Sequence, residues 1–145
     1  MNVPVHPADH YSHILESGRV LPRITVAVIH PVDALALEAA ADAQAEGLIT
    51  PILIGPQARI RKAAEENGID ISGWKVMDVE HSHAAAETGA ALAARGEVDA
   101  LMKGALHTDE LLAAVVAKEA GLRTERRMSH AYILDIPMYH KPLIV

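Results

Sequence analysis

The chain has 145 residues, half of them hydrophobic, with no cysteine and a formal net charge of −6 at pH 7. This length suits one domain with its own core, and the lack of cysteine excludes disulfides, thiolate metal sites and a cysteine nucleophile. The acidic balance argues against general nucleic-acid binding, because affinity for a phosphate backbone needs a basic surface.

Strands and helices alternate along the first half of the chain. A short helix is predicted at 10–17, followed by a buried strand at 23–30, where an apolar run lies between two prolines. The alanine-rich segment 32–47 predicts a helix that ends at a glycine. A second pair follows, with a strand at 50–55 and a helix at 56–68. The alternation indicates an α/β fold.

The second half of the chain continues this alternation. The predicted elements are two further pairs and then two strands: strand 74–80, helix 81–96, strand 98–104, helix 108–121, strand 129–137 and strand 141–145. Parallel neighbours need crossover helices, so we predict a three-layer α/β/α domain with a mostly parallel sheet. Ligands in such sheets bind outside the carboxyl ends of the strands.

One strand-to-helix junction has the residues that an anion site needs. Gly104 lets the backbone approach a ligand, Thr108 offers a hydroxyl, and Lys103 adds a positive charge. The helix that follows presents unpaired N–H groups and the positive end of its dipole. The alternative is purely structural: Thr108 caps the helix and Gly104 makes the turn.

A basic segment follows the last predicted helix of this acidic chain. Arg123, Arg126 and Arg127 lie close together, and guanidinium groups suit phosphates because their geometry matches two oxygens at once. The alternative is a solvated loop in which these arginines pair with Glu119 and Glu125.

Other site types are disfavoured by the motifs. The phosphate loop GxxxxGK[ST], the dinucleotide loop GxGxxG and the serine elbow GxSxG are all missing. His81 and His83 form the closest histidine pair, but they have no convincing carboxylate beside them and resemble the start of a helix. We therefore predict no metal site.

Three segments together resemble the phosphate acetyltransferase and phosphate butyryltransferase family: DALMKGALHTDELLAAVV, GLRTERRMSHAYILDIP and YHKPLIV. The resemblance extends over nearly the whole chain. It implies a fold like that of isocitrate and isopropylmalate dehydrogenases, and a reversible reaction of acyl-CoA with inorganic phosphate that gives acyl phosphate and CoA. Coenzyme A and phosphate are then substrates, and no cofactor is expected.

The family pattern assigns substrate-binding positions. Gly104, Ala105 and His107 match its glycine-containing loop, Thr108 matches its hydroxyl position, and Ser129 matches the serine that opens the strand after the basic loop. As a hypothesis, Lys103 joins them in binding phosphate or the acyl-phosphate end. The hypothesis gives Arg123, Arg126 and Arg127 to the phosphates of CoA. It assigns no catalytic residue.

Two positions depart from the acetyltransferase branch. Lys103 stands where that branch usually has a serine, and Ala114 stands where its helix carries an arginine. Both departures resemble the butyryltransferase-like branch, so the acyl chain length stays open between acetyl and butyryl.

Family members continue into a second domain, which this chain lacks. We therefore expect residues 1–145 to be the first α/β domain of a truncated phosphate acyltransferase, with little or no activity alone. The apolar end at 143–145 is either a short edge strand or the point where a longer chain is cut. The upstream hydratase domain joined to some members is also missing.

Two alternatives remain open: a non-catalytic binding or assembly domain with the same fold, and a dehydrogenase of the isocitrate type. With no secretory signal and no apolar run long enough to span a bilayer, we expect a cytoplasmic protein without membrane contact. An exposed apolar edge would favour a homo-oligomer.

Overall fold

The computed structural model describes residues 10–136 and 139–145, and the chain divides into two compact units. Arg23–Glu125 form the larger unit, and Met1–Pro22 with Arg126–Val145 form the smaller one. Each unit is described below by itself.

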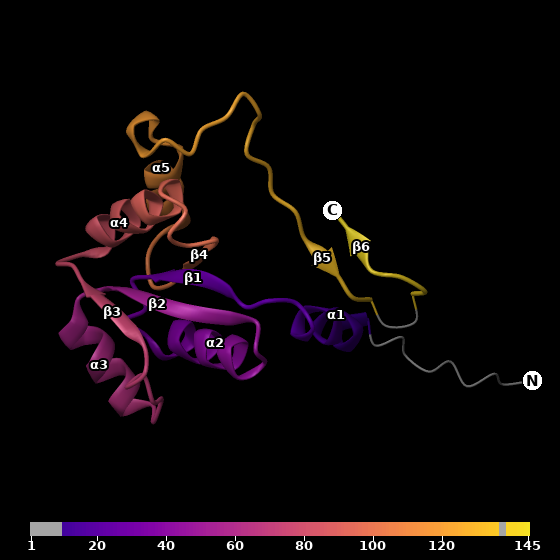
Figure 1. Ribbon diagram of the computed structural model, residues 1–145, viewed down its shortest axis with the longest axis horizontal. Coiled ribbons are helices and arrows are strands. Elements are labelled where there is room, and N and C mark those ends of the chain that lie inside the picture. Colours follow the sequence, from indigo (N-terminus) through magenta and orange to yellow (C-terminus); the bar gives the residue numbers. More distant parts are fainter. Residues whose placement is uncertain (1–9, 137–138) are drawn as a thin grey trace, which may run out of the picture. The chain divides into compact units, whose positions relative to one another are not determined.

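A four-stranded parallel sheet forms the centre of the larger unit (Figure 1). The spatial order of its strands is β3-β2-β1-β4. Their bounds are β1 Ile24–Ile29, β2 Ile49–Gly55, β3 Lys75–Asp78 and β4 Ala100–Lys103. The predicted parallel sheet is confirmed, because all three strand pairs are parallel.

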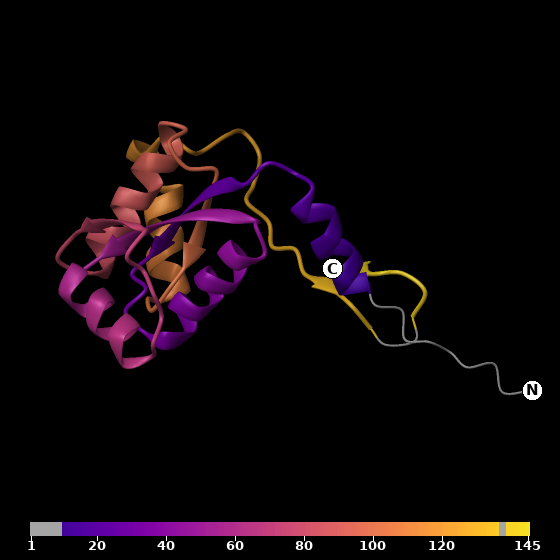
Figure 2. The ribbon, with the colours of Figure 1, turned by 60° about the horizontal axis from the view of Figure 1, so that its bottom comes forward.

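Helices cover both faces of this sheet. The bounds are α2 Ala34–Ala45, α3 Gln57–Glu66, α4 Ser82–Ala94 and α5 Thr108–Val116, with the short 3-10 helix η1 at Lys118–Ala120. Helices α2 and α3 lie on one face, and α4 and α5 lie on the other (Figures 1 and 2). This is the predicted three-layer α/β/α arrangement.

The alternation of side chains along β1 explains the two cores. Ala27 and Ile29 pack with α4 and α5, whereas Val28 packs with α2 and α3. Successive side chains of a strand point to opposite faces, so a strand covered on both sides must be apolar throughout. Leu37 and Ile60 are completely buried in the second core. Burying each such side chain stabilises the fold by about 1.5–3 kcal/mol.

The predicted helix at 108–121 ends earlier than expected. Helix α5 stops at Val116, where Ala117 takes an extended backbone conformation with ψ 136°, and η1 then leads to Gly121. Two β-branched residues at the end of α5 lower its helix propensity. Helix α3 also begins one residue later than predicted, at Gln57, because Pro56 occupies the N-cap position and not the first turn.

The smaller unit contains helix α1, His10–Arg19, and a two-stranded antiparallel sheet of β5 Ile133–Leu134 and β6 Leu143–Ile144. The backbone N–H of Tyr11 donates to the carboxylate of Asp135 at 3.0 Å within this unit.

The predicted strands at 129–137 and 141–145 are therefore too long. They also form a sheet of their own, separate from the parallel one. Ile133 is 61% exposed, so few apolar contacts are available to stabilise longer strands here. Between them, Pro137 and Met138 lie outside the described residues, so the predicted end of the first strand at 137 is not described.

Candidate functional site

The candidate site lies at the carboxyl ends of β1 and β4. From β1 the chain adds β2 and then β3 on one side, and then returns to place β4 on the other side of β1. Helix α2 follows β1 on one face, while α5 follows β4 on the other. In open α/β sheets, ligands bind at such a switch point, where the two connections leave in opposite directions.

The segment Lys103–Thr108, here called the 103–108 loop, crosses closely over the end of β1. The N–H of Gly104 donates to the carbonyl of Ile29 at 2.9 Å, and the N–H of Ala105 donates to the carbonyl of His30 at 3.0 Å. A Cβ atom at Gly104 would clash with the Ile29 carbonyl oxygen and would lie 2.8 Å from that of His30. The crossing of the two backbones thus requires glycine here, whether or not a ligand also approaches.

His30 connects the end of β1 to this loop through its side chain. Its Nδ1 lies 2.8 Å from the carbonyl oxygen of Ala105, which can only accept, so Nδ1 carries the proton. His30 is 6% exposed. Among the described residues it is the non-glycine residue with positive φ, at 55°. Such backbone conformations often occur at functional sites.

His30 was absent from the sequence-predicted site. The available signal was a histidine directly before a proline at the end of a buried strand. That signal says nothing about which later segment the ring reaches. The contact with Ala105 joins residues 75 positions apart and follows from the strand order.

Lys103 stabilises the 103–108 loop through hydrogen bonds within it. Its Nζ donates to the carbonyl of Leu106 at 2.7 Å and to that of Gly104 at 3.3 Å. A lysine ammonium has three N–H donors, so one remains for a ligand. Leu106 is buried in the core beneath α4 and α5, which anchors the middle of the loop.

The start of α5 does not have the Thr108 cap that a purely structural role of this junction would require. His107 is the N-cap residue, and its side chain makes no capping hydrogen bond, whereas Thr108 is the first residue of the helix. Thr108 therefore does not cap α5. The side chains of both His107 and Thr108 are exposed at the end of the loop, where they are accessible to a ligand.

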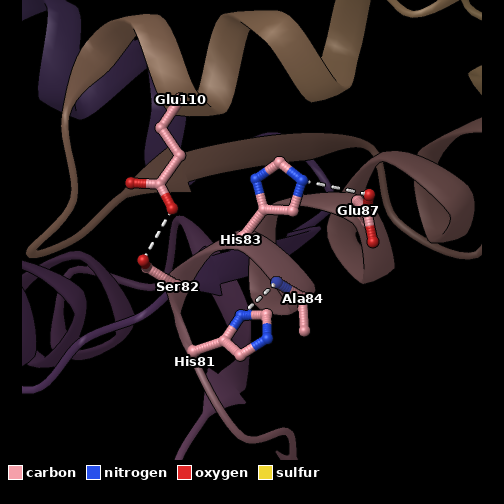
Figure 3. Close-up of polar contacts among 6 residues, drawn as sticks. All are labelled: His81, Ser82, His83, Ala84, Glu87 and Glu110. Atoms are coloured by element: carbon pink, nitrogen blue, oxygen red, sulfur yellow. Dashed lines mark hydrogen bonds and ion pairs between the residues drawn. The ribbon is translucent and has the colours of Figure 1, made fainter.

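The start of α4 contacts the start of α5 (Figure 3). The Ser82 hydroxyl donates to the Glu110 carboxylate at 2.6 Å. His81 is the N-cap of α4, with its Nδ1 accepting from the N–H of Ala84, and His83 pairs with Glu87 at 3.3 Å. The histidine pair is thus a helix entry, as expected. Residues 10–136 and 139–145 contain no group of three His, Cys, Asp or Glu side chains suited to a metal ion.

The basic segment is divided between the two units. Arg123 belongs to the larger unit, and Arg126, Arg127 and Ser129 belong to the smaller one; all four are exposed. Ser129 does not open a strand, which corrects the expectation, because β5 begins only at Ile133.

A groove of about 650 Å³ lies between α4 and the α5–η1 segment, away from the 103–108 loop. Its lining is mostly alanine and includes Ala114, which is 7% exposed. None of the loop residues lines it in the described part of the chain. In that same part, no helix is both long and apolar enough to cross a membrane.

Comparison with known proteins identifies related sequences. The family model for phosphate acetyl/butaryl transferase matches residues 22–88. The chain is 46% identical to a phosphate acetyltransferase of Rickettsia typhi, over 95% of this chain and 40% of that protein. It is 42% identical to a phosphate acetyltransferase of Rhizobium meliloti, over 98% and 45%. A phosphate butyryltransferase of Clostridium beijerinckii is 30% identical, over 95% and 46%.

Solved structures with the same fold include a branched-chain phosphotransacylase from Enterococcus faecalis. The alignment has a TM-score of 0.66 at 23% sequence identity and covers 83% of this chain and 41% of the phosphotransacylase chain. A Staphylococcus aureus phosphotransacetylase has a TM-score of 0.68 at 16% identity and covers 96% and 50%. The chain spans about two fifths of the Rickettsia typhi relative. Over 95% of its length the chain is similar to a phosphate acetyltransferase, and residues 22–88 match the phosphate acetyl/butaryl transferase family model.

Proposed function

We propose that the protein to which this chain belongs transfers an acyl group between coenzyme A and inorganic phosphate. The observation that carries this proposal is the 46% identity to a phosphate acetyltransferase over 95% of the chain. The geometry agrees with it, because the 103–108 loop is held at the switch point of a parallel sheet, where such folds bind ligands.

Acetyl-CoA is the acyl donor that we propose first. The relatives reported above with more than 40% identity are named phosphate acetyltransferases, whereas the butyryltransferase is 30% identical. This difference weighs against the butyryltransferase-like branch that Lys103 and Ala114 indicated in the sequence.

In the proposed reaction, a phosphate oxygen attacks the thioester carbonyl carbon. The new C–O bond forms as the C–S bond breaks, and CoA leaves as a thiolate that takes up a proton. The remaining N–H donor of Lys103, the Thr108 hydroxyl and the first N–H groups of α5 would hold phosphate. Acceleration would come from positioning and from stabilisation of the developing oxyanion.

The other assignments remain part of the proposal. Gly104, Ala105, His107 and Ser129 bind phosphate or the acyl-phosphate end, and three arginines bind the phosphates of CoA: Arg123, Arg126 and Arg127. CoA and phosphate act as substrates without a further cofactor. The chain supplies one α/β domain to a cleft that a second domain completes, in a cytoplasmic homo-oligomer.

The test is an assay of the full product of the gene that encodes this chain. Acetyl-CoA and butyryl-CoA are each supplied with phosphate, and thiol release is followed with a thiol reagent. We expect phosphate-dependent release that is faster with acetyl-CoA. Omitting phosphate measures simple thioester hydrolysis and is the control.

Two results would contradict the proposal. Thiol release that does not depend on phosphate would indicate a hydrolase. No release with either thioester would favour the non-catalytic binding or assembly domain, and a parallel nicotinamide absorbance assay would detect the isocitrate-type dehydrogenase.

A further inference from the structure

We propose that His30 is a positioning residue for phosphate binding, which it promotes by holding the 103–108 loop in its ligand-binding conformation. The proposal rests on the proposed function, because it takes this loop as the phosphate site. His30 itself lies at the end of β1 and acts on the ligand through the loop.

The contacts at the end of β1 show why the ring matters. Two backbone hydrogen bonds, from Gly104 and Ala105, fix the beginning of the loop to β1. The carbonyl of Ala105 is held by the ring of His30 at 2.8 Å. The next hydrogen bond along the loop is donated by Lys103 to the carbonyl of Leu106, and both of these residues belong to the loop itself. The His30 ring thus adds a side-chain hydrogen bond from the sheet to the loop, beside the apolar packing of Leu106 in the core.

The backbone of His30 is adapted to this contact. A φ of 55° destabilises the backbone of any residue that has a side chain, although histidine tolerates this region better than most residues. The surroundings hold it there: its N–H donates to the carbonyl of Ile54 at 2.7 Å, and its carbonyl accepts from Ala105. On the other side, a Cβ atom at Gly55 would lie 3.3 Å from the His30 Cα. The ring is therefore enclosed between the ends of β2 and β4.

The contact also determines the tautomer of the ring. Because Nδ1 donates to Ala105, the neutral imidazole carries its proton on Nδ1 and leaves Nε2 as an acceptor.

Two substitutions separate the ring from the backbone conformation. His30→Gly keeps the positive φ without strain but removes the donor. His30→Asn tolerates the same φ and places an amide N–H near the position of Nδ1. His83→Asn, on the exposed surface of α4, is the matched control.

The kinetic test uses the full gene product with acetyl-CoA and phosphate. We expect His30→Gly to raise the KM for phosphate about tenfold, with a change of less than about threefold in the KM for acetyl-CoA. His30→Asn should restore the phosphate KM to within about threefold of the parent value. An unchanged phosphate KM in His30→Gly, or equal losses in the glycine and asparagine variants, would overturn the proposal.

A second measurement does not depend on turnover or on folding of the glycine variant. The ¹⁵N NMR spectrum of histidine-labelled parent protein should show His30 as the Nδ1-protonated tautomer, assigned by its loss in His30→Asn. An Nε2-protonated ring would overturn the proposal.

If the parent protein shows the Nδ1-protonated tautomer but no turnover, the proposed function fails. Calorimetric titration with inorganic phosphate then decides about His30: weaker binding by His30→Gly supports it, and equal binding refutes it.

Discussion

The hydroxyl of Ser82 donates a 2.6 Å hydrogen bond to the carboxylate of Glu110, which joins the start of α4 to the first turn of α5. Ser82→Ala should lower the free energy of unfolding by about 1–2 kcal/mol, because the half-buried carboxylate loses a donor. In a double-mutant cycle with Glu110→Ala, which removes the acceptor, chemical denaturation should show a coupling of about 1 kcal/mol. Glu87→Gln, which affects an exposed pair, should change stability by less than about 0.5 kcal/mol. Additive effects of Ser82→Ala and Glu110→Ala would contradict the contact.

Gly104→Ala should destabilise the chain by about 1–3 kcal/mol, because its Cβ would clash with the backbone of Ile29 and His30. Gly73→Ala is the control, since a Cβ atom there meets nothing within 4 Å and φ is not positive. Urea denaturation followed by circular dichroism compares the two variants. Equal midpoints would mean that the loop does not cross β1 as closely as the structure shows.

Two leucines of α2 offer a matched pair for the core. Leu37 is completely buried beneath the sheet, whereas Leu35 is 75% exposed. Leu37→Ala should lower the free energy of unfolding by about 2–5 kcal/mol, through lost burial and the cavity that remains. Leu35→Ala should change it by less than about 0.5 kcal/mol. The same denaturation experiment tests both, and a reversed order would place the wrong face of α2 against the sheet.

Lys103→Ala and Thr108→Ala test the assignment of the phosphate site. Each variant should lower kcat/KM for phosphate in the full gene product by about tenfold or more, because a charged or hydroxyl donor to the anion is lost. Thiol release measures the effect. If both variants stay within about threefold of the parent rate, a difference under about 1 kcal/mol, the loop assignment is wrong.

Asp70 provides a titration test in the segment before β3. Hydrogen bonds from the side chain and the backbone N–H of Ser72 hold the pKa of Asp70 below its ordinary value of 3.8. A depressed folded pKa contributes stability that is present above the unfolded pKa and is lost as pH falls through the folded one. Ser72→Ala keeps the backbone donor, so NMR titration should show the Asp70 pKa rising only part of the way towards 3.8. A lower pKa in this variant would exclude the hydroxyl as a cause.

Local patterns were sufficient to predict the architecture of the larger unit. Apolar runs between turn residues located β1 to β4, and alanine-rich segments located the helices between them. These signals succeed because each element must bury a face, and burial leaves its period in the sequence. The two short strands of the smaller unit were predicted too long, because a short apolar run such as 131–134 does not reveal whether anything will cover it.

The sequence by itself determined that this is an α/β chain that resembles the phosphate acetyltransferase and phosphate butyryltransferase family, with an unusual junction at Lys103–Thr108. Only the tertiary structure decided what holds that junction. The strand order places the end of β1 beside the end of β4, so that the His30 ring meets the Ala105 carbonyl and the Ile29 carbonyl leaves room for glycine alone at position 104. Both contacts join residues about 75 positions apart, and local sequence patterns contain no information about such pairs.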